Sequence, residues 1–177
     1  MSRPSGPAAA TSPGQTPTPA RRRRSVLFVC TGNTCRSPMA EAIAAKLLEE
    51  SPVKDHTMVS SAGVNAVAGD RTTAEAREAL RSVQIDPDQR VSRAPTFGTS
   101  RPLTREIIAQ ADEIYAMTQS HARAVLSIEP TASGKVHVLD PDGGDIQDPI
   151  GRSQHVYTQT ARRLEDIIRR RIKELSL

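Results

Sequence analysis

The residues with the clearest chemical potential lie together at positions 30–37, which read Cys-Thr-Gly-Asn-Thr-Cys-Arg-Ser. Cys30 offers a thiolate, which is a strong nucleophile. Arg36 has a planar guanidinium that can bind two phosphate oxygens at once. Ser37 follows it and can donate a hydrogen bond to the thiolate. Together these residue types predict nucleophilic attack by Cys30 on a phosphorylated substrate.

A phosphate dianion needs many hydrogen-bond donors, and the backbone of this segment can supply them. The N–H groups of a loop that leads into a helix converge on an anion bound at the helix N-terminus. Gly32 and Asn33 are residue types that tolerate a left-handed backbone, which a tight loop requires. The same donors should lower the pKa of the Cys30 thiol. The predicted phosphate-binding loop therefore includes Thr31, Gly32, Asn33, Thr34, Cys35 and Ser37.

A cysteine and an arginine at this spacing are by themselves compatible with a buried strand-end cysteine and a surface arginine. The flanking sequence favours a site instead. Residues 26–29 form a continuous apolar run, typical of a strand buried on both faces. Ser37 and Pro38 predict a helix start, with Ser37 as N-cap and Pro38 at the first helical position. Ligands of parallel α/β folds bind beyond the carboxyl ends of the strands, and Cys30 stands at the first such end.

Strand and helix patterns alternate along the rest of the chain, which predicts an α/β domain with a parallel sheet and helices on both faces. We expect strands at 26–29, 58–61, 113–117 and 136–139. We expect helices at 37–51, at 73–83, from 102 onward, at 121–128 and at 155–175. The first helix should bury Ala40, Ile43, Ala44, Leu47 and Leu48. The last should bury a stripe made of Val156, Thr160, Leu164, Ile167, Ile168, Ile172 and Leu175.

The N-terminal segment 1–24 differs in composition from the remainder, which is the predicted globular domain 25–177. Residues 1–20 are almost entirely Ser, Pro, Ala, Thr and Gly, which predicts disorder. The segment holds five arginines and no acidic residue, and the remainder has 19 basic and 20 acidic residues. The arginine run 21–24 is interpreted as a solvated edge of the tail. A tether to an acidic partner, nucleic acid or membrane surface is the alternative.

Length and composition exclude several classes of protein. The 177 residues suffice for one domain with a real core, whereas two full domains would be cramped. No apolar run approaches the roughly 20 residues of a membrane span, and no signal-like stretch opens the chain. The two cysteines are too few for a secreted disulfide framework. We therefore expect a cytoplasmic protein without membrane insertion, whose near-neutral domain does not favour nucleic acid as a partner.

The segment 26–41 resembles the signature of the low-molecular-weight protein phosphatases. It reads Val-Leu-Phe-Val-Cys-Thr-Gly-Asn-Thr-Cys-Arg-Ser-Pro-Met-Ala-Glu. The similarity continues at 60–63 (Ser-Ser-Ala-Gly), at 111–118 (Ala-Asp-Glu-Ile-Tyr-Ala-Met-Thr) and at 148–149 (Asp-Pro). It thus extends over nearly everything outside the tail. Within the loop the resemblance is to the bacterial protein arginine phosphatases of this family.

The resemblance implies a three-layer α/β/α fold with a central four-stranded parallel sheet of flavodoxin-like topology. It also implies which carboxylic acid protonates the leaving group. The residues alone do not choose among the aspartates of one Pro/Gly-rich loop, which are Asp140, Asp142, Asp145 and Asp148. Asp148, followed by Pro149, matches the acid of the family. Ser61 matches the residue that supports the loop through Asn33, with an ordinary strand-end serine as the alternative.

The implied reaction has two steps and uses a phosphorylated protein as substrate. Cys30 attacks phosphorus in line while Arg36 and the loop amides hold the equatorial oxygens, and Asp148 protonates the leaving atom. Water activated by Asp148 then hydrolyses the phosphocysteine. No metal and no cofactor is implied. The histidines are scattered and receive no role: His56, His121, His137 and His155.

Cys35 lies in the same loop as Cys30, and this suggests redox control. Peroxide should convert Cys30 to a sulfenic acid, which Cys35 then captures as a disulfide. The alternative is that Cys35 is simply a small buried residue of the loop.

Residues 93–101 depart from the family pattern, because close relatives are shorter at this point. We expect an inserted surface loop here, and the sequence assigns it no function.

Other functions are open on the same residues. Thioredoxin-coupled arsenate reductases have a similar loop, but they need two further cysteines, and none follows Cys35. A non-enzymatic phosphate-binding module, or a nucleic-acid tether built on the tail, would predict loss of Cys30, Arg36 or Asp148. A hydrolase of small phosphate esters would need Cys30, Arg36 and Asp148 as well, so it stays an alternative.

The expected substrate is phosphoarginine, with phosphotyrosine as the alternative. Tyrosine phosphatases of the family usually carry a bulky aliphatic residue at the position of Thr34, whereas its arginine phosphatases carry Thr. A Thr hydroxyl can meet the N–H donors of a guanidinium, and Asp148 could both pair with the guanidinium and protonate the departing nitrogen. Ile150 stands where tyrosine-specific relatives usually have an aromatic ring. The arginine-specific relatives tend to have a ring there too, so Ile150 also weakens the arginine case somewhat.

Overall fold

The protein is built around a four-stranded parallel sheet. The computed structural model describes residues 23–89 and 94–175. The strands are β1 (Arg24–Cys30), β2 (Thr57–Gly63), β3 (Glu113–Ala116) and β4 (Val136–Val138), and they lie in the order β2-β1-β3-β4. Every neighbouring pair runs parallel. Central β1 has a strand on each side and a helical layer on each face, which explains its continuous apolar run.

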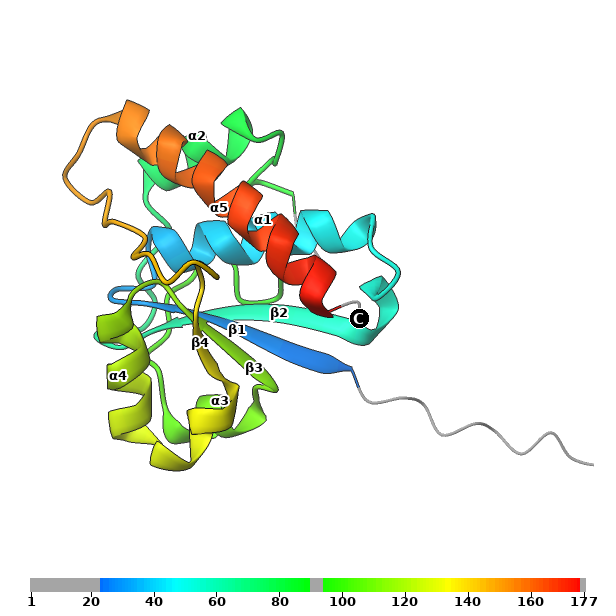
Figure 1. The fold of residues 1–177 in the computed structure, drawn as a ribbon. Helices are drawn as coiled ribbons and strands as arrows, with labels where there is room; N and C mark the ends of the chain where they lie inside the picture. The colour runs from blue at the N-terminus through cyan, green and yellow to red at the C-terminus, as the bar shows by residue number, and fades with distance from the viewer. Residues whose placement is uncertain (1–22, 90–93, 176–177) are drawn as a thin grey trace, which may run out of the picture.

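The helices form two layers, one on each face of the sheet (Figure 1). One layer contains α1 (Arg36–Glu49), α2 (Ala74–Ser82) and α5 (Gln154–Leu175). The other contains α3 (Arg105–Gln110) and α4 (Gln119–Ile128). The described residues also include two short 3-10 helices, η1 (Lys54–His56) and η2 (Pro130–Lys135). Successive residues of β1 alternate between the two cores, with Phe28 facing the first layer and Leu27 the second. The predicted three-layer fold with a central four-stranded parallel sheet is confirmed.

The start of α1 corrects one prediction. The helix begins at Arg36, its N-cap is Cys35, and Ser37 lies inside the first turn. Ser37 is not the cap because its hydroxyl contacts Cys30 and Asn33 instead. The predicted buried face of this helix is confirmed in full.

The buried stripe of α5 is rotated by one residue in its first half. Tyr157 and Ala161 are buried, whereas Val156 and Thr160, which we expected inside, are only half-buried. The reason is that the first turns of α5 pack against α1 and α2, with the Tyr157 hydroxyl reaching Cys35. The second half follows the prediction, with Leu164, Ile167, Ile168 and Ile172 buried and Leu175 packed against the core.

The expected surface loop at 93–101 is confirmed only in part for its described residues 94–101, where Pro95 and Thr99 are exposed. Ala94 and Ser100 are buried, and Phe97 packs against the core. The segment is tied to the loop after β2, because Ser100 N–H donates to the Asp70 carbonyl at 2.7 Å. Residues 94–101 are therefore an integral part of the fold, next to the end of β2.

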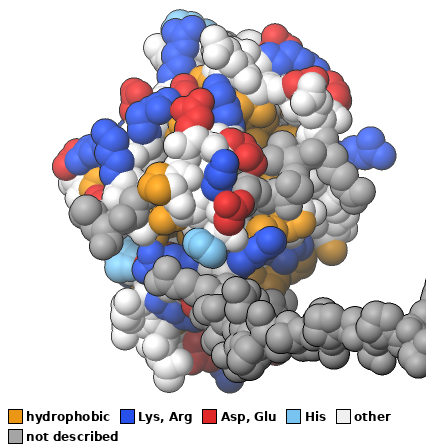
Figure 2. Space-filling view, turned by 90° about the vertical axis from the view of Figure 1, so that its right-hand side faces the viewer, with side chains coloured by type: hydrophobic (Ala, Val, Ile, Leu, Met, Phe, Trp, Pro, Cys, Tyr) orange, Lys and Arg blue, Asp and Glu red, His pale blue; other side chains and the backbone are white. Residues whose placement is uncertain are grey.

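The predicted disorder of the tail concerns residues that lie outside the described ranges, apart from Arg23 and Arg24. β1 begins at Arg24, one residue before the expected domain boundary. Basic and acidic side chains are interspersed on the face seen in Figure 2, with hydrophobic side chains in small separate patches. Within residues 23–89 and 94–175, no helix combines the length and the apolar composition that crossing a bilayer requires.

Candidate active site

The segment between β1 and α1 forms a tight loop whose ends are the two predicted catalytic residues, Cys30 and Arg36. Both are almost fully buried, whereas Thr31 between them is exposed. Asn33 has a left-handed backbone, with φ of 55°, as expected, but Gly32 does not. Gly63 at the end of β2 has a requirement of its own, because a Cβ there would overlap the Thr31 carbonyl oxygen. The sheet thus holds this loop at close range.

The Cys30 thiol is surrounded by hydrogen-bond partners from its own loop. Its Sγ lies 2.9 Å from Ser37 Oγ, and the Asn33 N–H donates to it at 3.3 Å. Burial raises the pKa of the Cys30 thiol, and the contacts with Ser37, Arg36 and Asn33 lower it by less. The expectation of a lowered pKa is therefore wrong for this structure, because withdrawal from water outweighs the donors. Ser37 can accept from the thiol or donate to the thiolate, so it serves both protonation states.

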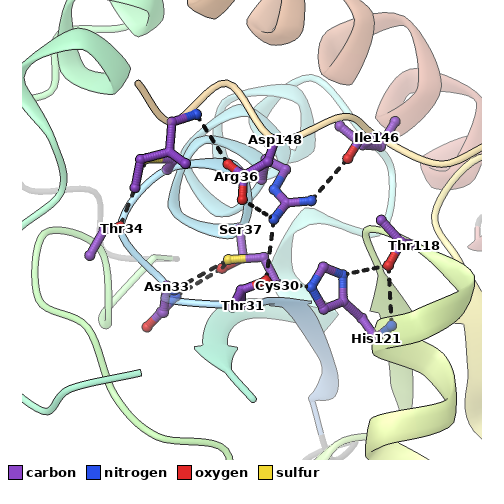
Figure 3. A network of polar contacts seen from close by, with 12 residues as sticks. Cys30, Thr31, Asn33, Thr34, Arg36, Ser37, Thr118, His121, Ile146 and Asp148 are labelled. Carbon is purple, nitrogen blue, oxygen red and sulfur yellow. Dashed lines mark hydrogen bonds and ion pairs between the residues drawn. The ribbon is translucent and has the colours of Figure 1, made fainter. Parts of the chain in front are cut away.

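Arg36 joins the loop to the predicted acid (Figure 3). Its Nη1 donates to the Ile146 carbonyl at 3.0 Å, and its Nη2 lies 2.6 Å from Asp148 Oδ2. The Nη2 group also donates to Thr31 Oγ1 at 3.4 Å. The Asp148 side chain is 41% exposed and that of Arg36 only 5%, so the pair stands at the boundary with solvent.

The four candidate aspartates are placed differently, and only Asp148 contacts the loop. Asp140 pairs with Arg163 and Asp142 with Arg170, both on α5. Asp145 accepts the Gln119 N–H at 2.9 Å. The contact with the loop thus distinguishes Asp148 from the three other aspartates, among which the residues alone could not choose.

A buried polar network lies behind the loop and includes the predicted support residue Ser61. Asn33 Nδ2 donates to Ser37 Oγ at 2.9 Å and to Ser61 Oγ at 2.8 Å. Asn33 Oδ1 accepts the Arg101 N–H at 2.9 Å. Every polar atom of the Asn33 side chain is therefore bonded within the protein, which fixes the loop in its left-handed turn.

Glu41 completes this network, although the sequence reasoning gave it no role. It lies on α1, is fully buried, and accepts from Ser61 Oγ at 2.6 Å. Its other oxygen accepts from Thr96, from the hydroxyl at 2.7 Å and from the N–H at 3.1 Å. Burial raises the pKa of the Glu41 carboxyl, and these bonds together with Arg101 lower it by less. In the sequence, the sign of a role for Glu41 was that it is a single acidic residue among the apolar residues of this helix.

His121 is a second residue that sequence reasoning missed. It lies on α4 and is buried, with Nε2 2.8 Å from Thr31 Oγ1 and Nδ1 2.9 Å from Thr118 Oγ1 (Figure 3). Burial lowers the pKa of His121 to about 4, assisted by Arg36 and opposed by Asp148 and Asp145. The imidazole is therefore neutral at neutral pH and contacts the loop directly. A histidine three residues after a capping Thr, beyond a buried strand, was the only signal.

Cys35 faces away from the site, toward α5. Its Sγ lies 3.6 Å from Tyr157 OH and 3.5 Å from Thr73 Oγ1, and both cysteines are free. A disulfide with Cys30 would require Cys35 to leave these contacts, so its redox role stays a prediction. Burial and the neighbouring Cys35 raise the pKa of Tyr157 to about 12.

The two residues that bear on substrate choice lie on separate segments. Thr34 is half-buried, and its carbonyl accepts the Thr73 N–H at 3.0 Å. Ile150 is 60% exposed, and its N–H donates to Asp148 Oδ1 at 3.2 Å.

This arrangement places a thiol, a guanidinium and a carboxylic acid around one loop of backbone amides at a helix N-terminus. Such a site suits covalent transfer of a phosphoryl group, because donors surround the anion and an acid is available for the leaving group.

Comparison with known proteins agrees with this class. Residues 25–176 match the family model described as low molecular weight phosphotyrosine protein phosphatase. The protein-arginine-phosphatase of Bacillus subtilis (strain 168) is 37% identical over 154 residues, which cover 85% of this chain and 95% of that protein. The tyrosine phosphatase PtpB of Staphylococcus epidermidis (strain ATCC 35984) is 36% identical over 146 residues, 81% of this chain and 93% of that protein.

A solved structure is similar over the same range. It is described as the YwlE arginine phosphatase, in a Cys-to-Ser mutant with a phosphorylated active-site serine. The match has a TM-score of 0.73 and 36% identity, and it covers 85% of this chain and 95% of that one. The chain therefore belongs to the low-molecular-weight phosphotyrosine protein phosphatase family.

Proposed function

We propose that this phosphatase forms a phosphocysteine on Cys30 and that phosphoarginine in proteins is its preferred substrate. The covalent step is supported by the contact of Cys30 with Ser37 and by the 2.6 Å pair between Arg36 and Asp148. The phosphorylated active-site serine of the YwlE Cys-to-Ser mutant supports the same chemistry.

The proposed reaction balances with these residues alone and uses no metal. The phosphoryl group takes the place of Asp148 on the Arg36 guanidinium. Cys30 reacts in its thiolate form, which its raised pKa makes the minor form and which donors from Ser37 and Asn33 stabilise. The thiolate forms an S–P bond while the P–N bond breaks, and Asp148 transfers a proton to the departing nitrogen. Water then attacks phosphorus, gives its proton to Asp148, and the S–P bond breaks to restore the thiolate.

The observation that carries the choice of substrate is Thr34, a half-buried residue of the phosphate-binding loop. Its hydroxyl suits the N–H groups of a guanidinium better than the apolar ring of a phenol. The aromatic residues do not separate the two substrates. Phe28, Tyr115 and Tyr157 are buried and Phe97 packs against the core, so a phenol ring and a guanidinium would both lack an aromatic face to stack on.

The test compares two peptides of the same sequence, one with phosphoarginine and one with phosphotyrosine. We expect the parent to have the higher kcat/KM on phosphoarginine. Thr34→Ile should lower that value about tenfold, the loss of one polar contact, and should favour phosphotyrosine. Cys30→Ser provides the inactive baseline, and Thr131→Ile, on exposed η2, is the matched surface control. A parent that prefers phosphotyrosine would make the assignment of substrate wrong and leave the Cys30 chemistry in place.

We also propose a cytoplasmic location, because the reaction needs Cys30 as a free thiol and a reducing compartment keeps it so. The catalytic unit is proposed to be the domain 25–177, with the tail 1–24 making no contribution to turnover.

A further inference from the structure

Thr31 stands between two partners that approach it from different elements. His121 Nε2 on α4 lies 2.8 Å from Thr31 Oγ1, and Arg36 Nη2 on α1 donates to the same oxygen at 3.4 Å. Thr31 is exposed, whereas His121 and Arg36 are buried. The hydroxyl is therefore held by buried groups and open on its remaining side.

The hydrogen-bond inventory favours one tautomer of His121. Arg36 has no acceptor, so it occupies one lone pair of Thr31 Oγ1. Thr118 Oγ1 accepts the His121 N–H at 3.1 Å and lies 2.9 Å from Nδ1. If Nδ1 accepts, the Thr118 hydroxyl uses both its proton and a lone pair, and Nε2–H donates to Thr31. Each tautomer leaves one hydroxyl proton without an acceptor among the described residues, that of Thr31 in this tautomer and that of Thr118 in the other. Thr31 is exposed and can donate to water, whereas Thr118 is half-buried, so the Nε2–H tautomer is the less costly one.

In the favoured arrangement Thr31 accepts two hydrogen bonds, from Arg36 and from His121. Of the donors in the hydrogen-bonded series Thr118, His121 and Thr31, the Thr31 hydroxyl is then the one whose proton has no partner within the described residues. Thr31 follows Cys30 directly and is exposed, so this proton is free to turn toward solvent near the thiol. A phosphoryl oxygen bound by the loop is the acceptor that fits there.

We propose that His121 is a positioning residue, which as the Nε2–H tautomer turns the Thr31 hydroxyl into a side-chain donor for the phosphoryl group. The inference rests on the proposed function, since it requires that the loop binds a phosphoryl oxygen. It adds one side-chain donor to the backbone amides and Arg36, and it makes a residue of α4 part of phosphate recognition.

The charges around His121 keep the imidazole neutral, as this role requires. Arg36 faces it from α1, and Asp145 and Asp148 face it from the loop after β4. Burial and Arg36 outweigh the two carboxylates, and this lowers the pKa of His121 to about 4.

The first measurement needs no variant. In the ¹⁵N spectrum of the labelled full chain at neutral pH, we expect the His121 ring to show a protonated Nε2 and an unprotonated Nδ1. The opposite tautomer would overturn the proposal.

The second measurement is calorimetric binding of inorganic phosphate. Thr31→Val should weaken phosphate binding about tenfold, the loss of one hydrogen bond to a charged group. Thr31→Ser should bind close to the parent. His121→Phe should weaken binding, and His121→Gln, which restores a donor, should recover part of the loss. Thr160→Val is the matched control, because its hydroxyl bonds only the Val156 carbonyl within α5.

The double variant separates positioning from a general structural effect. If His121 acts through Thr31, then Thr31→Val with His121→Phe binds phosphate no more weakly than Thr31→Val alone. Additive losses, or unchanged binding in Thr31→Val, would overturn the inference while phosphate binding by the parent upholds the proposed function. A parent that fails to bind phosphate would refute both.

Discussion

The phosphate-binding loop is supported from two sides that differ in burial. The buried side consists of Asn33, Ser61 and Glu41 together with half-buried Thr96, and its side-chain polar atoms are bonded to one another or to neighbouring backbone. The open side consists of Thr31, Arg36, Asp148 and His121, and here Thr31 and Asp148 reach solvent. Fixed partners set the shape of the loop, whereas partners at the solvent boundary can be exchanged for a substrate.

Each side contains one carboxyl group, and the contrast between the two shows how burial divides their roles. Glu41 is fully buried and accepts only from neutral donors of Ser61 and Thr96. Asp148 is exposed and pairs with Arg36. The first can only hold structure, because no substrate reaches it. The second can release its partner and exchange a proton.

Of the two carboxyl groups, the acid of the open side should have the larger effect on catalysis. Asp148→Asn keeps the size of the side chain but cannot transfer a proton. We expect kcat to fall by about 10²–10⁴-fold, the usual contribution of a general acid. Inorganic phosphate should still bind, because the loop and Arg36 are intact. Steady-state kinetics and calorimetry measure the two quantities.

Asp142→Asn is the control, since Asp142 lies in the same loop and pairs with Arg170 on α5 rather than with Arg36. Equal losses in the two variants would mean that Asp148 has no distinct role.

Removing the acid of the buried side should instead reduce stability. Glu41→Met preserves length but leaves the Ser61 hydroxyl and two Thr96 donors unsatisfied. At about 1–3 kcal/mol for each orphaned group, we expect the free energy of unfolding to fall by at least about 3 kcal/mol. Urea unfolding measures it. Glu41→Gln keeps an acceptor for Thr96 and should lose less.

Glu50→Met, at the exposed end of the same helix, should leave stability near that of the parent. If Glu41→Met were as stable as the parent and lost only activity, the buried side would not act as a structural support of the loop.

The open side also gives a pH signature through His121. Its folded pKa is about 4 and its ordinary value is 6.5, so the unfolded chain binds the proton more readily. Stability should therefore be full above pH 6.5 and fall as the pH drops toward 4. The His121 contribution amounts to at most about 3 kcal/mol. His121→Gln should flatten this part of the curve, and His155→Gln, at an exposed position, should not.

Glu41 changes the stability with pH in the direction opposite to His121. Its raised pKa means that the folded state holds the proton more tightly, so its contribution to stability falls as the pH rises above 4.5. The difference between the parent and His121→Gln removes this common background. A difference that does not change between pH 4 and 6.5 would contradict a lowered His121 pKa.

The fold and the loop could be predicted because they depend on local patterns. The run at 26–29, the sequence Cys-x5-Arg-Ser and the alternation of strands and helices each record their structure within a few residues. The support from Thr96 and Arg101 could not be predicted, because it depends on a segment more than 50 positions from Glu41 in the chain. The same holds for His121, whose partner Thr31 is 90 positions away. Hydrogen bonds between distant segments leave no periodic signal in a sequence.

The prediction that the pKa of Cys30 is lowered was wrong for a related reason. The donors were visible in the sequence, but the depth of burial was not, and burial dominates. The choice of Asp148 among four aspartates came from resemblance, and the contact with Arg36 gives it a physical basis that the residues alone did not contain.

The smallest expected effect concerns the N-terminal tail, which should leave both sides of the loop unchanged. Deleting residues 1–22 should alter neither Tm nor kcat, because the strand that carries Cys30 begins at Arg24. Deleting residues 1–24 removes the pairing of Arg24 with Thr57 in the sheet and the 3.3 Å contact with Glu113. That contact is solvent-exposed, so we expect a loss of at most about 1 kcal/mol, with kcat unchanged. Thermal unfolding of the two truncated proteins, measured beside the full chain, distinguishes the boundaries. A fall in Tm already with the shorter deletion would show that the folded domain extends into the tail, and a fall in kcat with either would show that the tail acts on the loop.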